Sequence, residues 1–172
     1  MIWQALTGKR ILITGAGGYI AANLTAALGD TPCRIVRIDR PGAYFPPCGG
    51  RGPEIRDVEM DLRRRDAWEE MMEDVDIVYH LAAQTSVYAA EQDPEADLGI
   101  NVLPLLRLLA ICRKEGSHPA IVFAGTATEA GLTETLPVNE DHPDRPITIY
   151  DFHKLAVERY LLHYTTGKYV RG

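Results

Sequence analysis

The feature that most constrains the fold is a short apolar run followed at once by a glycine-rich turn. Residues 9–14 have the pattern of a buried strand, Gly15 and Gly18 follow, and residues 22–28 are rich in Ala and Leu and helical in pattern. Glycine lets the backbone approach a phosphate closely, and a helix N-terminus offers free N–H groups and partial positive charge. The order strand, glycine turn, helix is therefore typical of a phosphate-binding turn, although a tight structural turn would carry the same glycines.

The spacing of this turn is Gly15-x-x-Gly18-x-x-Ala21 and not the strict G-x-G-x-x-G. The last position serves close packing of helix on strand, and alanine adds only a methyl group there, so we expect the turn to form. Gly29 is expected to cap the end of the helix.

An acidic residue follows the next strand at the position where a nucleotide-binding fold needs one. Residues 33–39 alternate in polarity and end in Asp39, roughly 20 residues past the glycine turn. A carboxylate there would bond the ribose hydroxyls of NAD and repel the 2′-phosphate of NADP. The neighbouring Arg40 weakens this preference, because an arginine can accept a phosphate. A turn residue at the end of a strand is the alternative interpretation of Asp39.

Alternation of strands and helices continues along the chain. Residues 55–60, 75–81 and 120–124 are predicted strands, and residues 41–53 form a Pro- and Gly-rich loop. Helices are expected over residues 63–73, from Asp93-Pro94 to about residue 114, and from Thr148 onward, where Thr148-x-x-Asp151 is close to a capping box. Pro104 should kink its helix or lie in a first turn. Five strands alternating with helices predict a doubly wound parallel α/β sheet.

Residues suited to proton transfer lie late in the chain. Tyr150 and Lys154 are four apart in the last predicted helix and share one face, beside a hydroxyl, Thr126, at the end of the fifth strand. A nearby cation favours the phenolate, so a phenol of reference pKa ~10 could act as a base nearer neutral pH. A solvated helix face would show the same spacing. His80 is expected to be a core or supporting histidine.

Composition and charge exclude several function classes. The chain has 172 residues, which suits one domain, and 46% are hydrophobic, which is enough for a substantial core. The net charge is −6 without a basic stripe, so no nucleic-acid partner is expected. No apolar run reaches the ~20 residues that cross a membrane, and the first residues lack the pattern of a signal peptide. Three scattered cysteines fit neither a disulfide framework nor a metal site, which favours a cytoplasmic protein with reduced thiols.

Four features occur together in order. They are the turn Thr14-Gly15-x-x-Gly18-Tyr19-Ile20, then Asp39, then His80-Leu81-Ala82-Ala83, then Thr126 upstream of Tyr150-x-x-x-Lys154. In this combination nearly the whole chain resembles the extended short-chain dehydrogenases/reductases, in particular the NAD-dependent nucleotide-sugar epimerase/dehydratase family and its UDP-glucose 4-epimerases. The resemblance implies a Rossmann-type doubly wound sheet and NAD as cofactor. It assigns cofactor contacts to Gly15, Gly18, Tyr19, Ile20, Asp39, Arg40, Asp61, Leu62, Leu81, Ala82, Ala83, Thr85, Asn101, Tyr150 and Lys154.

The resemblance also implies a reaction and catalytic residues. Tyr150 would deprotonate the sugar hydroxyl, Thr126 would hold its oxygen, and Lys154 would bond the nicotinamide ribose and lower the pKa of Tyr150. The Thr126-Ala127-Thr128 segment is similar to the Ser-Ala-Thr of 4-epimerases, whereas 4,6-dehydratases carry an Asp-Glu pair there, so epimerisation of a UDP-sugar is favoured. Two departures are Ala130 where the family often has Tyr, which concerns the sugar pocket, and Leu103-Pro104-Leu105 in a helix that commonly continues with Gly-Thr.

The resemblance further implies a domain organisation. Residues 1–172 would be the NAD-binding domain, ending before the C-terminal substrate domain of such enzymes, and a homodimer through the helices near residues 97–114 and Tyr150 is expected. Two alternatives stay open: an NAD-dependent sugar reductase or dehydrogenase on the same scaffold, and a non-catalytic NAD-binding domain.

Overall fold

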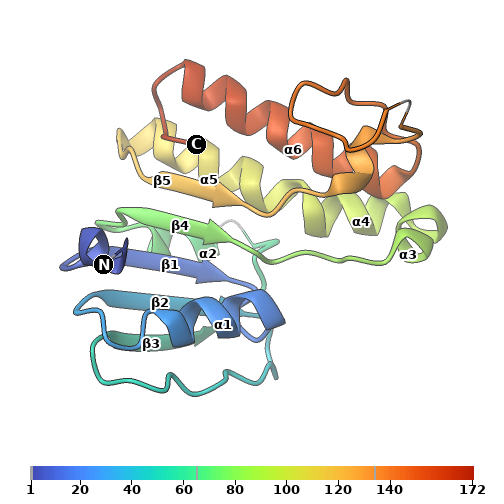
Figure 1. Ribbon diagram of the computed structural model, residues 1–172. Coiled ribbons are helices and arrows are strands. Elements are labelled where there is room, and N and C mark those ends of the chain that lie inside the picture. Colours follow the sequence, from blue (N-terminus) through green and yellow to red (C-terminus); the bar gives the residue numbers. More distant parts are fainter. Residues whose placement is uncertain (1, 65, 134) are drawn as a thin grey trace.

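Five parallel strands in the order β3-β2-β1-β4-β5 form the centre of the molecule, shown in Figure 1. The computed structural model describes residues 2–64, 66–133 and 135–172. The strands are β1 (Arg10–Thr14), β2 (Arg34–Asp39), β3 (Glu54–Glu59), β4 (Ile77–His80) and β5 (Ala120–Phe123). Successive strands are added to one side of β1 up to β3 and then to its other side from β4 onward. This strand order is that of a doubly wound dinucleotide-binding fold, so the predicted fold class is confirmed.

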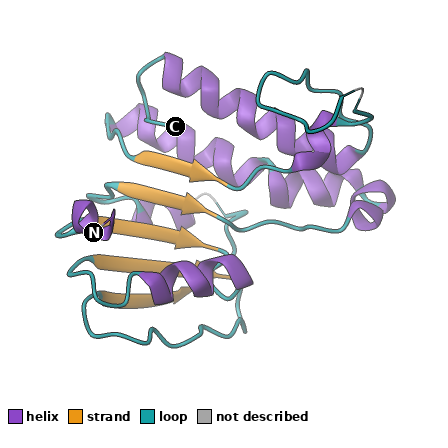
Figure 2. Cartoon of the chain, in the orientation of Figure 1, coloured by secondary structure: helices purple, strands orange, loops and turns teal. Residues whose placement is uncertain are grey.

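Helices cover the sheet unevenly (Figure 2). They are η1 (Ile2–Leu6), α1 (Tyr19–Ala27), α2 (Asp66–Met71), α3 (Val87–Gln92), α4 (Pro94–Asn101), α5 (Leu103–Glu115), η2 (Ala127–Ala130) and α6 (Ile149–Thr166). Helix α1 lies on one face of the sheet, and α2, α5 and α6 lie on the other (Figure 1). The α1 face of β5 is left uncovered by the described helices, and Val122 on that face is 46% exposed.

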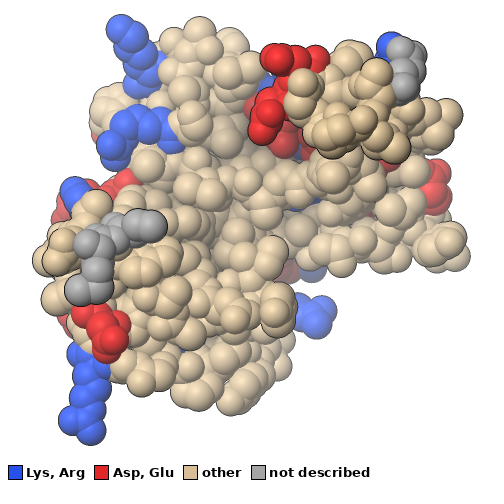
Figure 3. Space-filling model, viewed as in Figure 1, with Lys and Arg blue, Asp and Glu red and all other residues tan. Residues whose placement is uncertain are grey.

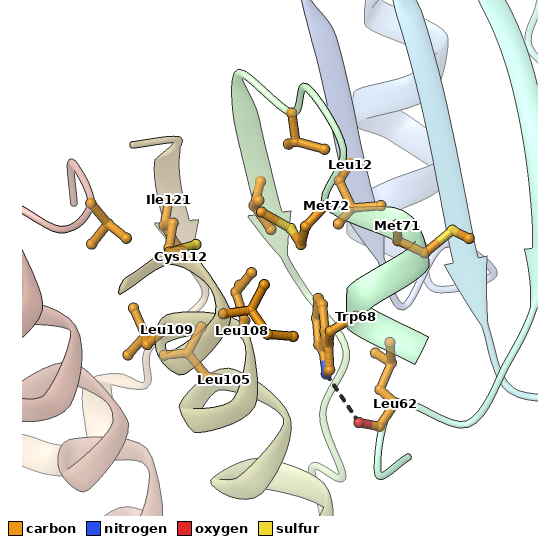
Figure 4. Packing of buried hydrophobic residues seen from close by; sticks show 14 of the residues in the cluster. Leu12, Leu62, Trp68, Met71, Met72, Leu105, Leu108, Leu109, Cys112 and Ile121 are labelled. Atoms are coloured by element: carbon orange, nitrogen blue, oxygen red, sulfur yellow. Dashed lines mark hydrogen bonds between the residues drawn. The ribbon is translucent and has the colours of Figure 1, made fainter. Parts of the chain in front are cut away.

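Alternation along the strands explains the two cores. Ile11 and Ile13 of β1 point to the α1 side with Ala21 and Ile35, while Leu12 points to the opposite side. The larger core gathers Leu12, Trp68 of α2, Leu105, Leu108 and Leu109 of α5 and Ile121 of β5, as Figure 4 shows. The Trp68 indole is completely buried, and its N–H donates to the carbonyl of Leu62 at 3.2 Å.

The helices differ from expectation between β4 and β5. The single helix predicted from Asp93 to about residue 114 is two helices that meet at Val102, and an unpredicted helix, α3, precedes them. Pro104 lies in the first turn of α5, where its missing N–H would have no partner in the helix, so a new helix begins there. Asp93 accepts a hydrogen bond from Ala96 N at 2.9 Å and caps α4.

Other boundaries shift by a few residues. Helix α2 covers only the middle of the predicted 63–73 segment. Arg63 lies in the preceding turn and pairs with Asp61 there, Arg64 pairs with Asp66 at the start of the helix, and Arg65 lies outside the described residues. Helix α1 starts at Tyr19, three residues earlier than predicted, and its C-cap is Leu28, so the prediction for Gly29 was wrong by one residue. The capping box of α6 formed as predicted, with Thr148 as its N-cap.

Charged side chains are spread over the molecule. On the face shown in Figure 3, the described Lys and Arg side chains lie apart at the edges, and the middle of the face is uncharged. Within the described ranges, no helix is both long and apolar enough to span a membrane, and no cluster of His, Cys, Asp and Glu could hold a metal ion.

Candidate functional site

A groove of about 970 Å³ opens at the carboxyl end of the parallel strands. It is lined by residues that follow β1, β2, β3 and β4, so it lies where the strand order reverses and open α/β sheets bind ligands. Most of the predicted cofactor contacts line it: Gly15, Gly18, Tyr19, Ile20, Asp39, Arg40, Asp61, Leu62, Leu81, Ala82, Ala83 and Thr85. The predicted contacts Asn101, Tyr150 and Lys154 are not among its lining residues.

The glycine turn is packed against the end of β4. Gly15 has φ +66°, and a Cβ there would lie 2.7 Å from the backbone nitrogen of Ala82, so only glycine fits this close approach. Thr14 joins the same two strand ends, because its Oγ1 accepts hydrogen bonds from the N–H groups of Leu81 and Ala82, both at 3.1 Å. The turn is therefore rigid and leaves the N-terminus of α1 open to the groove.

Gly17, a position not predicted from the sequence, binds the turn to β2 together with Ala16, whose N–H donates to the carbonyl oxygen of Ile38. The N–H of Gly17 donates to Oδ2 of Asp39 at 2.8 Å, and a Cβ on Gly17 would lie 2.7 Å from the carbonyl oxygen of Tyr44. Oδ1 of Asp39 accepts from the N–H of Arg40 at 2.7 Å. These bonds hold the Asp39 carboxylate at the edge of the groove. The G-x-G spacing of Gly15 and Gly17 was the signal for this position.

The segment after β3 is fixed from both sides. The Arg63 guanidinium hydrogen-bonds the Asp61 carboxylate at 2.6–3.0 Å and thereby lowers its pKa. The Trp68 indole holds the carbonyl of Leu62 from inside the core. Asp61 and Leu62 thus present a fixed wall to the groove.

Asn101 lies behind the groove and not in it. Its amide donates to the carbonyl oxygen of Gln84 at 3.1 Å and accepts from the N–H of Gln84 at 3.0 Å. This pair of bonds fixes the backbone of a lining residue between Ala83 and Thr85. The position of Asn101 is that of a supporting residue.

Tyr150 and Lys154 share a buried face of α6. Tyr150 is 9% exposed and Lys154 is 2% exposed. The Lys154 ammonium donates to the carbonyl oxygen of Ala124, just past β5, and lies 4.0 Å from the centre of the Phe123 ring. Burial lowers the pKa of Lys154 to about 8, although the carboxylates of Glu129, Glu158 and Asp97 act to raise it.

The expected effect of Lys154 on Tyr150 is not found. Burial raises the pKa of Tyr150, and the carboxylates of Asp97, Asp151 and Glu129 raise it further. The predicted lowering was wrong for this arrangement, because the lysine ammonium is bound to a backbone carbonyl and the charges that act on the phenol are negative.

Thr126 is connected to the Tyr150 helix through a second threonine. Oγ1 of Thr126 and Oγ1 of Thr128 are 2.8 Å apart, and the Thr128 hydroxyl donates to Oδ1 of Asp151 at 2.5 Å. Thr126 is also the N-cap of η2. The three predicted catalytic residues, Thr126, Tyr150 and Lys154, therefore belong to one neighbourhood at the end of β5.

Two buried polar residues near this neighbourhood, Asp97 and Glu129, were missed. Asp97 of α4 accepts from the side chains of Gln84 and Asn101 and lies 2.6 Å from Nδ1 of His153. Glu129 is 5% exposed, and burial together with Glu158 raises its pKa to about 7. Asp97 could have been predicted, because it lies four residues before Asn101 on the same helix face. No local pattern predicts the burial of Glu129.

His80 is a core residue, as expected. It is 1% exposed, and its Nδ1 lies 3.0 Å from Oγ1 of Thr14. Because that oxygen already accepts two backbone bonds, its proton is free to go to Nδ1. Burial, with a contribution from the Lys154 charge, lowers the pKa of His80 to about 3, so the ring is neutral near neutral pH.

This fold and groove define a class. A parallel sheet in this order, a glycine turn on a helix N-terminus, an acid after the second strand and a Tyr/Lys helix are together those of a dinucleotide-binding protein of the short-chain dehydrogenase type. The chain belongs to the NAD dependent epimerase/dehydratase family, whose profile matches residues 11–171.

Individual relatives are nucleotide-sugar epimerases. UDP-glucuronate 4-epimerase 1 of Arabidopsis thaliana is 32% identical over 161 residues, covering 88% of this chain and 38% of that protein. UDP-glucose 4-epimerase of Azospirillum brasilense is 32% identical over 164 residues, covering 92% of this chain and 45% of that protein. The chain thus spans less than half the length of these curated relatives.

Solved structures agree. UDP-glucose 4-epimerase from Thermus thermophilus, solved in complex with NAD, superposes with a TM-score of 0.75 at 29% identity, covering 94% of this chain and 52% of that one. UDP-N-acetylglucosamine 4-epimerase from Methanobrevibacter ruminantium superposes with a TM-score of 0.82 at 23% identity, covering 95% and 53%, and shows the shared fold. The family is one of NAD-dependent enzymes.

Proposed function

We propose that this chain is the NAD-binding part of a nucleotide-sugar 4-epimerase that acts on a UDP-sugar. The observation that carries the proposal is the placing of Thr126, Tyr150 and Lys154 in one neighbourhood at the end of β5, on the sheet edge that also bears the groove. The 4-epimerases among its relatives support the same reaction.

The residues that line the groove are suited to bind NAD. The close packing that Gly15 and Gly17 permit leaves the N-terminus of α1 open to the groove, where its N–H groups can face a pyrophosphate. The Asp39 carboxylate suits ribose hydroxyls and repels a 2′-phosphate, so NAD is favoured over NADP. The small side chains of Ala82 and Ala83 leave room for a flat ring against the backbone.

In the proposed reaction, NAD supplies the hydride acceptor and donor. Tyr150 takes the proton of the sugar C4 hydroxyl, Thr126 holds that oxygen, and the sugar passes through a transient ketone. The Lys154 ammonium would bond the nicotinamide ribose.

The proposal extends to domain organisation and assembly. Residues 1–172 form the cofactor domain, and further chain would supply most of the sugar-binding surface. A cytoplasmic homodimer is proposed, supported by exposed apolar side chains on α4 and α6, namely Leu98, Phe152, Tyr160 and Leu162. Light scattering of the purified protein tests the dimer.

Two other functions compete with epimerisation. A sugar reductase or dehydrogenase would use the same Thr126, Tyr150 and Lys154. Its NADH absorbance would change in proportion to the amount of substrate converted. A non-catalytic NAD-binding domain would bind NAD without converting any sugar. The buried Tyr/Lys pair favours an enzyme, since a protein that only binds NAD needs no base.

The test is conversion of UDP-glucose and UDP-glucuronate by the full protein with NAD, followed by separation of the sugar products. An epimerase forms the C4 epimer with no net NADH. Tyr150→Phe should abolish conversion but leave NAD binding intact, whereas Tyr88→Phe, at an exposed tyrosine of α3, should be fully active. Net NADH formation would establish the dehydrogenase instead, and NAD binding without product from any sugar would establish the binding domain.

A further inference from the structure

The connection between β2 and β3 is unusual for neighbouring parallel strands. Such strands are commonly joined by a helix, but residues 40–53 contain none. We call residues 40–48 the strap. Arg40, Gly42, Ala43 and Tyr44 of the strap line the groove, on the side where Asp39 lies. An irregular segment can form a binding wall only if something outside it holds its conformation.

A buried arginine supplies that hold. Arg37 of β2 is 3% exposed, and its Nε and Nη2 donate to the two carboxylate oxygens of Asp57 on β3 at 2.6 and 2.7 Å. Its Nη1 donates to the carbonyl oxygen of Pro46 in the strap at 2.6 Å. The guanidinium carbon also lies 5.6 Å from the centre of the Phe45 ring. Arg37 therefore joins both strands to the middle of the strap.

The rest of the strap is attached at three more points. The N–H of Gly42 donates to Oε2 of Glu59 at 2.8 Å, and the thiol of Cys48 lies 3.4 Å from the carbonyl oxygen of Thr25 in α1. Between them, the carbonyl oxygen of Tyr44 lies so close to Gly17 that a Cβ would be 2.7 Å away. The strap thus runs from β3 over the glycine turn to α1.

Arg37 differs from these attachments in being both buried and charged. It sits at an inward position of a strand whose other inward residues are apolar, Ile35, Val36 and Ile38. A charge at such a position is retained only with full hydrogen bonding, which the two oxygens of Asp57 and the Pro46 carbonyl provide. If the Arg37 guanidinium were removed, Pro46 would lose its hydrogen bond to the sheet and the Phe45 ring would lose its contact with the guanidinium.

We infer that Arg37 is a positioning residue for the cofactor: it holds the strap against the glycine turn and so shapes the wall of the groove beside Asp39. It does so from inside the sheet, and Arg37 itself is not among the residues that line the groove. The inference rests on the proposed NAD site and adds a determinant that lies outside it.

Arg37→Met tests the inference, because methionine keeps an apolar stem of similar length and removes every donor. Hydrogen exchange measured by mass spectrometry should show faster exchange of the backbone amides of residues 41–48. Calorimetric titration should show NAD binding weakened by about tenfold or more, as expected if only about a tenth of the molecules hold the strap in place. Arg34→Met, at an exposed arginine of the same strand, should change neither measurement.

A second variant covers the case in which Arg37→Met does not fold. Asp57→Asn keeps the shape of the partner and removes its charge, and Asp57 is itself 39% exposed, so folding is retained. It should also speed exchange in residues 41–48 and weaken NAD binding. Folded variants with wild-type exchange, or with faster exchange and wild-type NAD affinity, would overturn the inference. If the wild-type chain binds no NAD, the proposed function fails, while exchange in the strap still reports whether Arg37 anchors it.

Discussion

Nδ1 of His153 lies 2.6 Å from Oδ2 of Asp97, which joins the helix of Tyr150 and Lys154 to α4. Asp97 is 2% exposed, and its other oxygen accepts from Gln84 and Asn101. One carboxylate therefore holds the wall of the groove at Gln84 and the face of α6 that carries the proposed base. Since a carboxylate can only accept, His153 carries its proton on Nδ1.

Asp97→Ala should remove this junction. Three donors, on Gln84, Asn101 and His153, lose their acceptor, and unpaired buried donors are costly. We expect the free energy of unfolding to fall by about 3 kcal/mol in urea denaturation. Glu95→Ala, an exposed acid in the first turn of the same helix, should change it by no more than about 0.5 kcal/mol. Equal effects of the two variants would refute the role given to Asp97.

Two glycines should respond to alanine in opposite directions. Gly15→Ala places a Cβ 2.7 Å from Ala82 N at φ +66°, so we expect a loss of about 2 kcal/mol in unfolding free energy and much weaker NAD binding. Gly99 lies inside α4 with no neighbouring atom within 4 Å of its would-be Cβ. Gly99→Ala should stabilise the protein by about 1 kcal/mol, because alanine is the better helix former. Thermal unfolding measures the stability of both variants, and calorimetric titration measures NAD binding by Gly15→Ala.

Features signalled by local patterns were predictable from the sequence. Short apolar runs gave the strands, glycines marked the turn after β1, and the Thr148 capping box marked the start of α6, because each depends on residues close together in the chain. The groove followed from these, since parallel strands bring their carboxyl ends to one edge. The break at Val102 was signalled only by Pro104, which was expected to kink the helix or to lie in a first turn and lies in the first turn of α5, because apolar periodicity continues across the break.

Features made by residues far apart in the chain were not predictable. Arg37 occupies what looks like an outward position of an alternating strand, and its burial depends on Asp57 and Pro46. Glu129 resembles a loop acid, yet the fold buries it beside Glu158. The raised pKa of Tyr150 likewise depends first on burial and then on carboxylates, two of which come from α4 and η2 and are not revealed by spacing within α6.

Glu129 should make stability depend on pH in the acidic range. Burial and Glu158 raise its pKa from 4.5 to about 7 in the folded protein. As pH rises between these values, the unfolded chain loses the proton and the folded protein keeps it, so the free energy of unfolding falls. Glu129→Gln cannot titrate and should exceed wild type by about 2 kcal/mol above pH 7, with the difference vanishing near pH 4.

The matched variant for this comparison is Glu140→Gln, in the exposed loop before α6. It should follow the wild-type pH profile in urea denaturation. A wild-type profile for Glu129→Gln as well would mean that the Glu129 carboxyl is not held protonated by the fold.

Lys154 should show the opposite pH dependence, in the alkaline range. Burial lowers its pKa from 10.5 to about 8, so below pH 8 the folded protein bears the cost of a buried charge. Between pH 8 and 10.5 the folded protein releases that proton while the unfolded chain keeps it, and the free energy of unfolding rises with pH. Lys154→Met should therefore be more stable than wild type by about 2 kcal/mol at neutral pH, although it would lack the proposed catalytic ammonium.

Urea denaturation at several pH values should show the stabilities of Lys154→Met and wild type converging above pH 8. Lys114→Met, at the exposed end of α5, should keep the pH dependence of wild type. A Lys154→Met protein that is less stable than wild type at every pH would contradict this prediction. It would show that the buried ammonium of Lys154 stabilises the folded protein.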